Sequence, residues 1–191
     1  MAAFEEGRST RSTRPVVHSV SELRARFREG KAALLAHFAT SRPTAPAATR
    51  LLRALAKQVD QTLLDLWRHA GMPAGCALLA VGGYGRSELF PHSDVDVLVL
   101  MPGDALTGDN SRKTSVEAFI TACWDIGLEI GSSVRTLNEC AVESQRDVTV
   151  QTALLESRLI SGARKLFAEF QRETQLLMDP KIGRASWRDR V

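Results

Sequence analysis

The residues Ala77-Leu-Leu-Ala-Val-Gly-Gly-Tyr-Gly-Arg-Ser-Glu-Leu-Phe-Pro-His-Ser-Asp-Val-Asp-Val-Leu-Val-Leu100 decide the fold of this chain. Two almost continuously apolar runs, residues 78–81 and 95–100, predict strands that are buried on both faces. A glycine turn and a short connection separate them. Because side chains alternate along a strand, Asp94 and Asp96 are expected on the same face, about 7 Å apart along the backbone. Two negative charges held this close indicate a cation between them.

The composition is that of one ordinary domain with an appendage, since 44% of the 191 residues are apolar. No apolar run approaches the roughly 20 residues of a membrane span, and Glu5 and Glu6 lie where a signal peptide would be apolar. We therefore expect a cytoplasmic protein with no membrane partner. Cys76, Cys123 and Cys140 form no Cys-x-x-Cys motif and are expected to be reduced and buried.

The net charge of +3 comes from the C-terminal end of the chain. Residues 181–191 hold four of the 25 basic side chains and one of the 22 acidic ones, which leaves 21 of each for residues 1–180. Nucleic-acid binding is usually accompanied by a clustered basic face, so we expect no nucleic-acid partner. Residues 181–191 also have no apolar period, and we expect a disordered or non-native tail there.

The first part of the chain is predicted to be helical after a flexible leader at residues 1–18, which has no apolar period. Residues 19–72 form the predicted helical segment. Ser19 and Glu22 have the spacing of a capping box at the start of its first helix. A second helix is predicted over residues 49–70, after a loop at 39–48, and Gly71 and Pro73 end it.

The rest of the core is predicted over residues 73–180. Thr114 and Glu117 have capping-box spacing before a helix that ends at Gly127. Residues 128–136 alternate well enough for a third strand, in which Glu129 lies between apolar neighbours. Two helices are predicted to follow, one from residue 147 to 162 and one through residues 166–177.

The chemistry is expected from the opening stretch. Glycines after a strand allow backbone N–H groups to approach an anion, so Gly82 and Gly83 are candidates for a phosphate-binding turn. Alone, a Gly-Gly turn is more often structural, and the P-loop and dinucleotide fingerprints are absent. The Asp pair alone is equally weak, because solvated strand ends often carry Asp. The glycine turn, the Asp pair and a third carboxylate, Glu129, together make a much stronger signal.

This combination resembles the nucleotidyltransferases of the DNA polymerase beta type, in which Gly-Gly or Gly-Ser precedes Asp-x-Asp or Asp-x-Glu. The resemblance implies an α+β fold, with a small mixed sheet flanked by helices and further helices N-terminal to it. It also implies Mg²⁺, a hard ion that binds carboxylate and phosphate oxygens. Two such ions can clamp the attacking and leaving oxygens of an in-line displacement at the α-phosphorus.

Several stretches narrow the resemblance to the bacterial protein-PII uridylyltransferase and uridylyl-removing family, over about residues 20–179. They are Gly-Gly-Tyr-Gly-Arg at 82–86, Glu-Leu-Phe-Pro at 88–91, Ser-Asp-Val-Asp-Val-Leu at 93–98, Trp-Asp at 124–125, Leu-Glu-Ile-Gly at 128–131, Ser-Val-Arg-Thr at 133–136 and Leu-Leu-Glu-Ser-Arg-Leu-Ile at 154–160. The family resemblance implies transfer of a uridylyl group from UTP to a tyrosine hydroxyl of a PII signalling protein, with release of pyrophosphate.

The resemblance assigns roles to matching residues. Gly82 and Gly83 would cradle the triphosphate, with Ser93 among the nucleotide-binding residues. Asp94, Asp96 and the third carboxylate would be catalytic and hold Mg²⁺, with Glu129 the candidate for the third position. The remaining nucleotide-binding candidates are two arginines, for which a surface or structural role has equal weight: Arg86 and Arg135.

Full-length members of this family are several times longer, with an HD domain that removes the uridylyl group and two ACT domains that sense glutamine. We expect a truncated chain that lacks these domains, with exposed apolar surface on its last two helices. Two alternatives stay open. One is a catalytically silent fragment that binds nucleotide or a partner, and the other is a nucleotidyltransferase that uses another nucleotide or acceptor.

Overall fold

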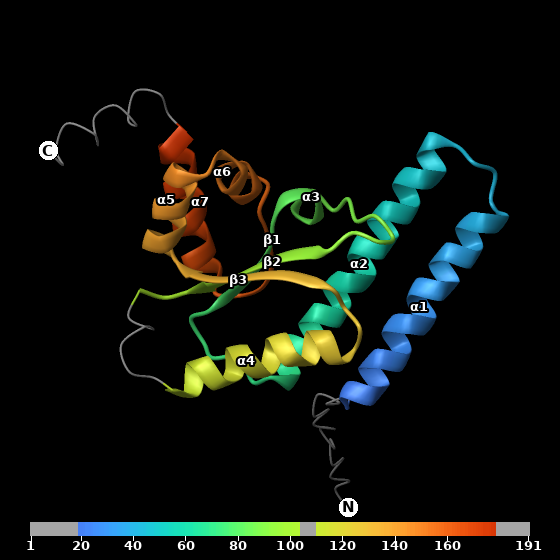
Figure 1. The fold of residues 1–191 in the computed structure, drawn as a ribbon, viewed down its shortest axis with the longest axis horizontal. Helices are drawn as coiled ribbons and strands as arrows, with labels where there is room; N and C mark the ends of the chain where they lie inside the picture. Colours follow the sequence, from blue (N-terminus) through green and yellow to red (C-terminus); the bar gives the residue numbers. More distant parts are fainter. Residues whose placement is uncertain (1–18, 104–109, 179–191) are drawn as a thin grey trace, which may run out of the picture.

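A mixed sheet lies at the centre of the structure, a computed structural model that describes residues 19–103 and 110–178 (Figure 1). Within these residues the strands are β1 (Ala77–Ala80), β2 (Val95–Met101), β3 (Ile130–Thr136) and β4 (Arg158–Gly162), in the order β3-β2-β1-β4. β1 is antiparallel to both β2 and β4, whereas β2 and β3 are parallel. The α+β class and the mixed sheet are therefore confirmed.

Helices cover both faces of this sheet because the central strands are almost continuously apolar, so that both faces present apolar side chains. Val95, Val97 and Val99 of β2 belong to one buried cluster with α1 (Val20–Thr40), α2 (Ala45–His69) and α4 (Asn110–Asp125). Leu98 and Leu100 belong to a second cluster with α5 (Leu137–Arg146), α6 (Val148–Leu155) and α7 (Arg164–Met178). Figure 1 shows α4 on one side of the sheet and α5, α6 and α7 gathered on the other.

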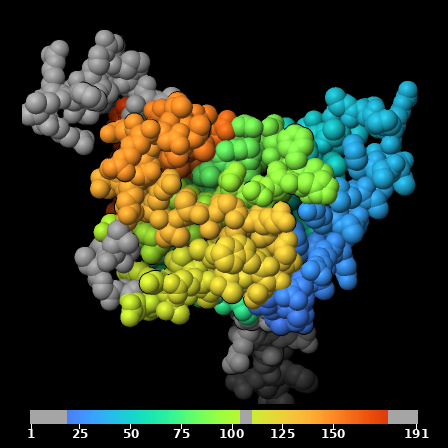
Figure 2. Space-filling model, viewed as in Figure 1, coloured from blue at the N-terminus to red at the C-terminus, as the bar shows by residue number. Residues whose placement is uncertain are grey.

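The two N-terminal helices form a hairpin whose far end projects from one side of the molecule (Figure 2). The capping box predicted at Ser19 is present: its hydroxyl accepts the Glu22 N–H, and its own N–H binds the Glu22 carboxylate. The prediction of a loop through residue 48 is wrong. α2 already begins at Ala45, because the Thr44 hydroxyl caps it and the first turn of a helix accepts proline.

Two further predictions about helices are wrong. α4 begins at Asn110, so Thr114 lies inside it and donates its hydroxyl to the Asn110 carbonyl instead of capping the helix. The helix predicted to reach residue 162 ends at Leu155, and β4 follows and pairs with β1. Gly162, with φ of 94°, faces the Cys76 carbonyl so closely that a Cβ there would overlap it.

The burial of the cysteines and of the last helices agrees with the predictions. Cys76, Cys123 and Cys140 are buried and unpaired, as expected. The last helices expose apolar side chains, as predicted: Val148, Leu155 and Leu176. In the described part of the chain, no helix has the length and apolar character needed to cross a membrane. The predicted leader at 1–18 and tail at 181–191 lie outside the described residues.

Candidate functional site

Asp94 directly precedes β2, Asp96 is the second residue of this strand, and both are exposed. Asp96 is on the same face as Leu98 and Leu100, but it is exposed whereas the two leucines are fully buried. Partial burial of its carboxyl, and then the charge of Asp94, raise the pKa of Asp96. This end of the strand therefore presents two carboxylates that interact through their charges, which favours a cation.

The glycine turn lies directly beside this pair. Gly82 to Gly85 form one helical turn, α3 (Gly82–Gly85), immediately after β1. Gly82 has a φ of 58°, and a Cβ on it would lie 3.8 Å from Asp96 Oδ2. The N–H of Val81 donates to the Asp96 carbonyl at 3.1 Å, which ties the start of the turn to β2. The fold thus brings the sequence-predicted turn and carboxylate together.

On the opposite side, β3 approaches Asp96 through a glycine. Gly131 pairs with Asp96 in the parallel ladder, and a Cβ at Gly131 would lie 2.5 Å from Asp96 Oδ1. Sequence reasoning gave this glycine no role. Its place in Leu-Glu-Ile-Gly at 128–131 was visible, but only the strand register shows what it faces.

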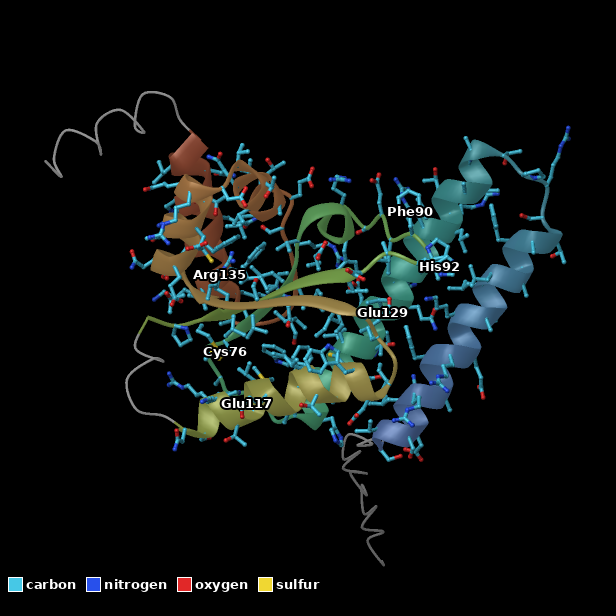
Figure 3. The ribbon with its side chains drawn as sticks, in the orientation of Figure 1. Cys76, Phe90, His92, Glu117, Glu129 and Arg135 are labelled. Atoms are coloured by element: carbon cyan, nitrogen blue, oxygen red, sulfur yellow. The ribbon has the colours of Figure 1, made fainter. Side chains whose placement is uncertain are left out.

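Glu129 comes just before β3 and is exposed (Figure 3). Its carbonyl accepts the Val95 N–H at 2.9 Å. Val95 pairs with Ile130 in the parallel ladder, so the preceding residues, Asp94 and Glu129, lie opposite each other. Within residues 19–103 and 110–178, no three His, Cys, Asp or Glu side chains are arranged to hold a metal ion. Two aspartates suit Mg²⁺ nonetheless, because this ion is usually held by one or two carboxylates together with substrate phosphates and water.

Arg86 lies beside the turn but is engaged by carboxylates. Its Nη2 would be 3.6 Å from a Cβ on Gly83. Its Nη1 pairs with Glu156, and its Nε donates to Glu88 Oε2 at 3.2 Å. The hydrogen bond to Glu156, followed by that to Glu88, raises the pKa of Arg86. The guanidinium therefore lies beside the turn while its Nε and Nη1 are held by two carboxylates.

The last two predicted residues differ in position. Ser93 adjoins Asp94, and its hydroxyl donates to the Phe90 carbonyl at 3.2 Å. Arg135 pairs in register with Leu100, four residues further along β3 than Gly131, or roughly 13 Å along the strand. Figure 3 shows Glu129 and Arg135 towards opposite ends of this strand. The structure thus groups Ser93 with the carboxylates and leaves Arg135 apart.

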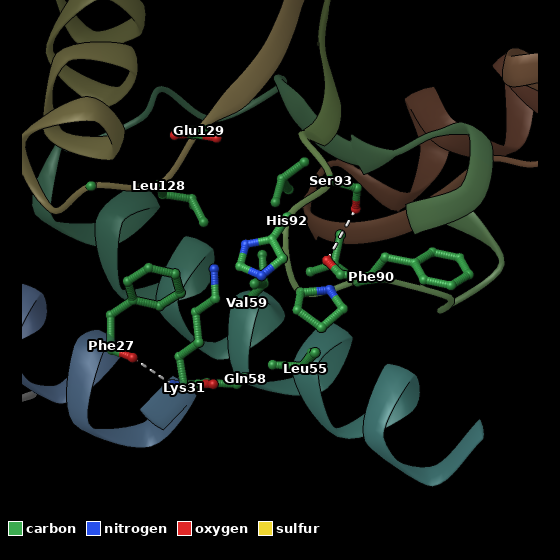
Figure 4. Close-up of a pocket in the computed structure, with 14 residues that line it drawn as sticks. Phe27, Lys31, Leu55, Gln58, Val59, Phe90, His92, Ser93, Leu128 and Glu129 are labelled. Carbon is green, nitrogen blue, oxygen red and sulfur yellow. Dashed lines mark hydrogen bonds between the residues drawn. The ribbon is translucent and has the colours of Figure 1, made fainter. Parts of the chain in front are cut away.

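A pocket of about 140 Å³ lies between the N-terminal helices and the connection before β2 (Figure 4). Its polar lining includes Lys31, Gln58 and His92, and it is also bordered by Ser93 and Glu129. Two of the predicted site residues therefore border a hollow to which α1 and α2 contribute.

A group of residues that sequence reasoning missed lies behind the turn. Asp60 of α2 accepts hydrogen bonds from the Tyr84 hydroxyl at 2.5 Å and from Arg158 of β4 at 2.8 and 3.0 Å. No local pattern connects residues this far apart in the sequence, so only the fold could show the group.

The chain matches no known protein-family profile. It is similar to proteins named bifunctional uridylyltransferase/uridylyl-removing enzyme. The one from Ralstonia nicotianae is 55% identical over 129 residues, which cover 68% of this chain and 15% of the relative. Those from Cupriavidus pinatubonensis and Cupriavidus metallidurans are 46% and 45% identical over 168 and 167 residues, which cover 88% and 87% of this chain.

The chain spans less than a fifth of the length of these relatives, since the matched segments cover 15%, 18% and 19% of them. The matched part nevertheless includes most of this chain. Over most of its length, the chain is therefore homologous to part of the bifunctional uridylyltransferase/uridylyl-removing enzymes.

Proposed function

We propose that this chain transfers a uridylyl group from UTP to a tyrosine hydroxyl of a PII nitrogen-regulatory protein in the cytoplasm, with Mg²⁺ and with release of pyrophosphate. The observation that carries the proposal is the position of the Gly82 turn against Asp96 at the open end of β2. The names of the homologues support uridylyl transfer in general.

Asp94 and Asp96 would hold the ion. They offer hard oxygen donors on one face of a strand, and the raised pKa of Asp96 reflects partial burial and a charge repulsion that a cation would relieve. When bound, Mg²⁺ would neutralise charge on the triphosphate and on the transition state of the displacement at the α-phosphorus. The exposed ends of both carboxylates leave room for phosphate oxygens and water in the remaining positions.

The other residues would bind and orient the substrates. The backbone N–H groups of Gly82 and Gly83 would bind the phosphates. Arg86 would assist them, since its Nη2 would be 3.6 Å from a Cβ on Gly83. The tyrosine oxygen attacks the α-phosphorus, a new P–O bond forms, and the bond to the bridging oxygen of the β-phosphate breaks. Pyrophosphate carries away that electron pair, and the phenolic proton passes to the Glu129 carboxylate.

Label transfer from UTP to PII tests the proposal. We expect wild type to label PII in the presence of Mg²⁺ and Asp94→Asn to lose this activity. Asp125→Asn removes an exposed carboxylate at the end of α4 and is the matched control, which should retain the activity. No transfer by a folded wild-type chain would contradict the proposal. If that chain still bound UTP and Mg²⁺, it would be the silent nucleotide-binding alternative.

The choice of nucleotide is tested in the same assay with ATP in place of UTP. We expect a preference for UTP. A preference for ATP would overturn uridylyl transfer and leave the broader nucleotidyltransferase assignment intact.

A further inference from the structure

Three side chains from three separate elements meet behind the glycine turn. Asp60 of α2 accepts the Tyr84 hydroxyl through Oδ1, and Arg158 of β4 binds the same carboxylate with both terminal nitrogens. The Arg158 guanidinium also lies 5.5 Å from the centre of the Tyr84 ring. This group, the Asp60–Tyr84–Arg158 network, joins the N-terminal helices to the turn and to the edge strand.

The network combines a buried tyrosine with two partly exposed side chains of opposite charge. Tyr84 is 2% exposed, and the side chains of Arg158 and Asp60 are 30% and 26% exposed. Burial, and then the charge of Asp60, raise the pKa of Tyr84, so its hydroxyl remains a neutral donor. A bidentate arginine in this setting fixes the direction of the carboxylate, which a single lysine charge would not do.

Arg158 extends the network to the backbone of the turn. Its Nη2 and Nε donate to the carbonyls of Tyr84 and Gly85, each at 3.4 Å. Gly85 lies so close to the Glu156 carbonyl that a Cβ would overlap it. The rear of the turn is thus held by hydrogen bonds and close packing. Its front, at Gly82, faces Asp96.

The geometry points to Asp60, Tyr84 and Arg158 as positioning residues. They hold the glycine turn where it and the Asp94–Asp96 pair can bind the same triphosphate. The catalytic consequence rests on the proposed function. None of the three side chains needs to touch substrate. Their effect passes through the turn, where a displacement of the order of 1 Å can reduce the rate about a hundredfold.

The test uses Tyr84→Phe and Asp60→Asn, with Asp65→Asn as the matched control. Asp65 is also on α2 and also holds two arginines, Arg26 and Arg68, at 3.6 and 3.1 Å, but the structure gives it no interaction with the turn. For the two network variants we expect KM for UTP to rise about tenfold, with a smaller fall in kcat, and the control to stay within about twofold of wild type. Hydrogen exchange at the amides of residues 82–88 should quicken in the network variants alone.

A purely structural role predicts another pattern. The variants would then melt at lower temperature but keep wild-type KM and kcat per folded molecule, and this result would overturn the inference. Unchanged hydrogen exchange at the turn would also overturn it. Arg158→Lys keeps the charge but loses the two-pronged contact, so wild-type kinetics in that variant would count against it. If the variants loosen the turn while wild type transfers no nucleotide, the proposed function fails. The role of the network in holding the turn would still stand.

Discussion

Gly131 and Asp96 are neighbours in the parallel ladder, and the carboxylate of Asp96 occupies the space that a side chain at residue 131 would take. A Cβ on Gly131 would lie 2.5 Å from Asp96 Oδ1, whereas on the other side a Cβ on Gly82 would lie 3.8 Å from Oδ2. The carboxylate is therefore bounded by two glycines from different elements. This relationship lets side-chain size at Gly131 control the direction of a predicted metal ligand.

Gly131→Ala should reduce activity without unfolding the protein. The atom that must move is the free end of a side chain, so the fold should tolerate the change, but the carboxylate should turn away from its present direction. We expect turnover to fall by about 10- to 100-fold and the Mg²⁺ concentration for half activity to rise. Steady-state kinetics against Mg²⁺ measure both.

Gly103→Ala is the control for that variant, because a Cβ on Gly103 would meet no atom of the described residues within 4 Å. Its kinetics should equal those of wild type. Equal kinetics for Gly131→Ala as well would contradict the view that the glycine fixes the direction of Asp96.

Glu156→Gln should strengthen nucleotide binding. Glu156 pairs with Arg86, whose side chain is 48% exposed and next to Gly83, so removing the acidic charge frees the guanidinium for phosphate. Exposed ion pairs contribute little, so we expect KM for UTP to fall by only about two- to fivefold.

The matching control is Glu143→Gln, which breaks the exposed pair between Arg146 and Glu143 on α5. It should leave KM unchanged. A rise in KM for Glu156→Gln would show that Arg86 needs its carboxylate partner and does not serve as a phosphate contact.

Asp147→Ala should destabilise α6 in a manner that depends on pH. Asp147 caps this helix by accepting the Thr149 hydroxyl and N–H at 2.6 and 2.7 Å, and the hydroxyl, followed by the N–H, lowers the pKa of Asp147 below 3.8. A lowered pKa means that the stabilisation is complete above 3.8 and is lost as the pH falls through the folded-state value.

Thermal midpoints of wild type and Asp147→Ala at several pH values measure this effect. We expect the difference between them to be full at neutral pH and to shrink on acidification below 3.8. Asp147→Asn caps without titrating and should keep its advantage over Ala at every pH. A difference between wild type and Ala that does not change with pH would exclude the charged cap.

The glycine turn and the Asp pair could be predicted because their signals are local. The apolar runs at 78–81 and 95–100 closely match β1 and β2, since strands buried on both faces have no polar side. The position of Gly82 then followed from the turn between the two strands, and that of Asp96 from the alternation of side chains along β2.

The errors arose where pairing at long range decides the structure. Leu155 and Leu159 are spaced as in a helix, but residues 158–162 form β4 because they complete the free edge of β1. The role of Gly131 depends on the register of β3, and Asp60 meets Arg158 across 98 residues of sequence. Neither periodicity nor capping signals contain that information.

The N-terminal helices, which the sequence separates from the core at residue 72, share a buried cluster with that core. Leu63 of α2 is 0% exposed and shares one buried cluster with Val97 of β2 and Phe119 of α4. Leu63→Ala should therefore cost about 2–5 kcal/mol of the free energy of unfolding, whereas Leu155→Ala, at a site 40% exposed, should cost only about 0.5 kcal/mol. Urea unfolding followed by far-ultraviolet circular dichroism and by hydrogen exchange of β2 should give coincident transitions in both variants. If residues 19–72 melted before β2 exchanged, the helices would be a separate unit, and Asp60 could not hold the turn through them.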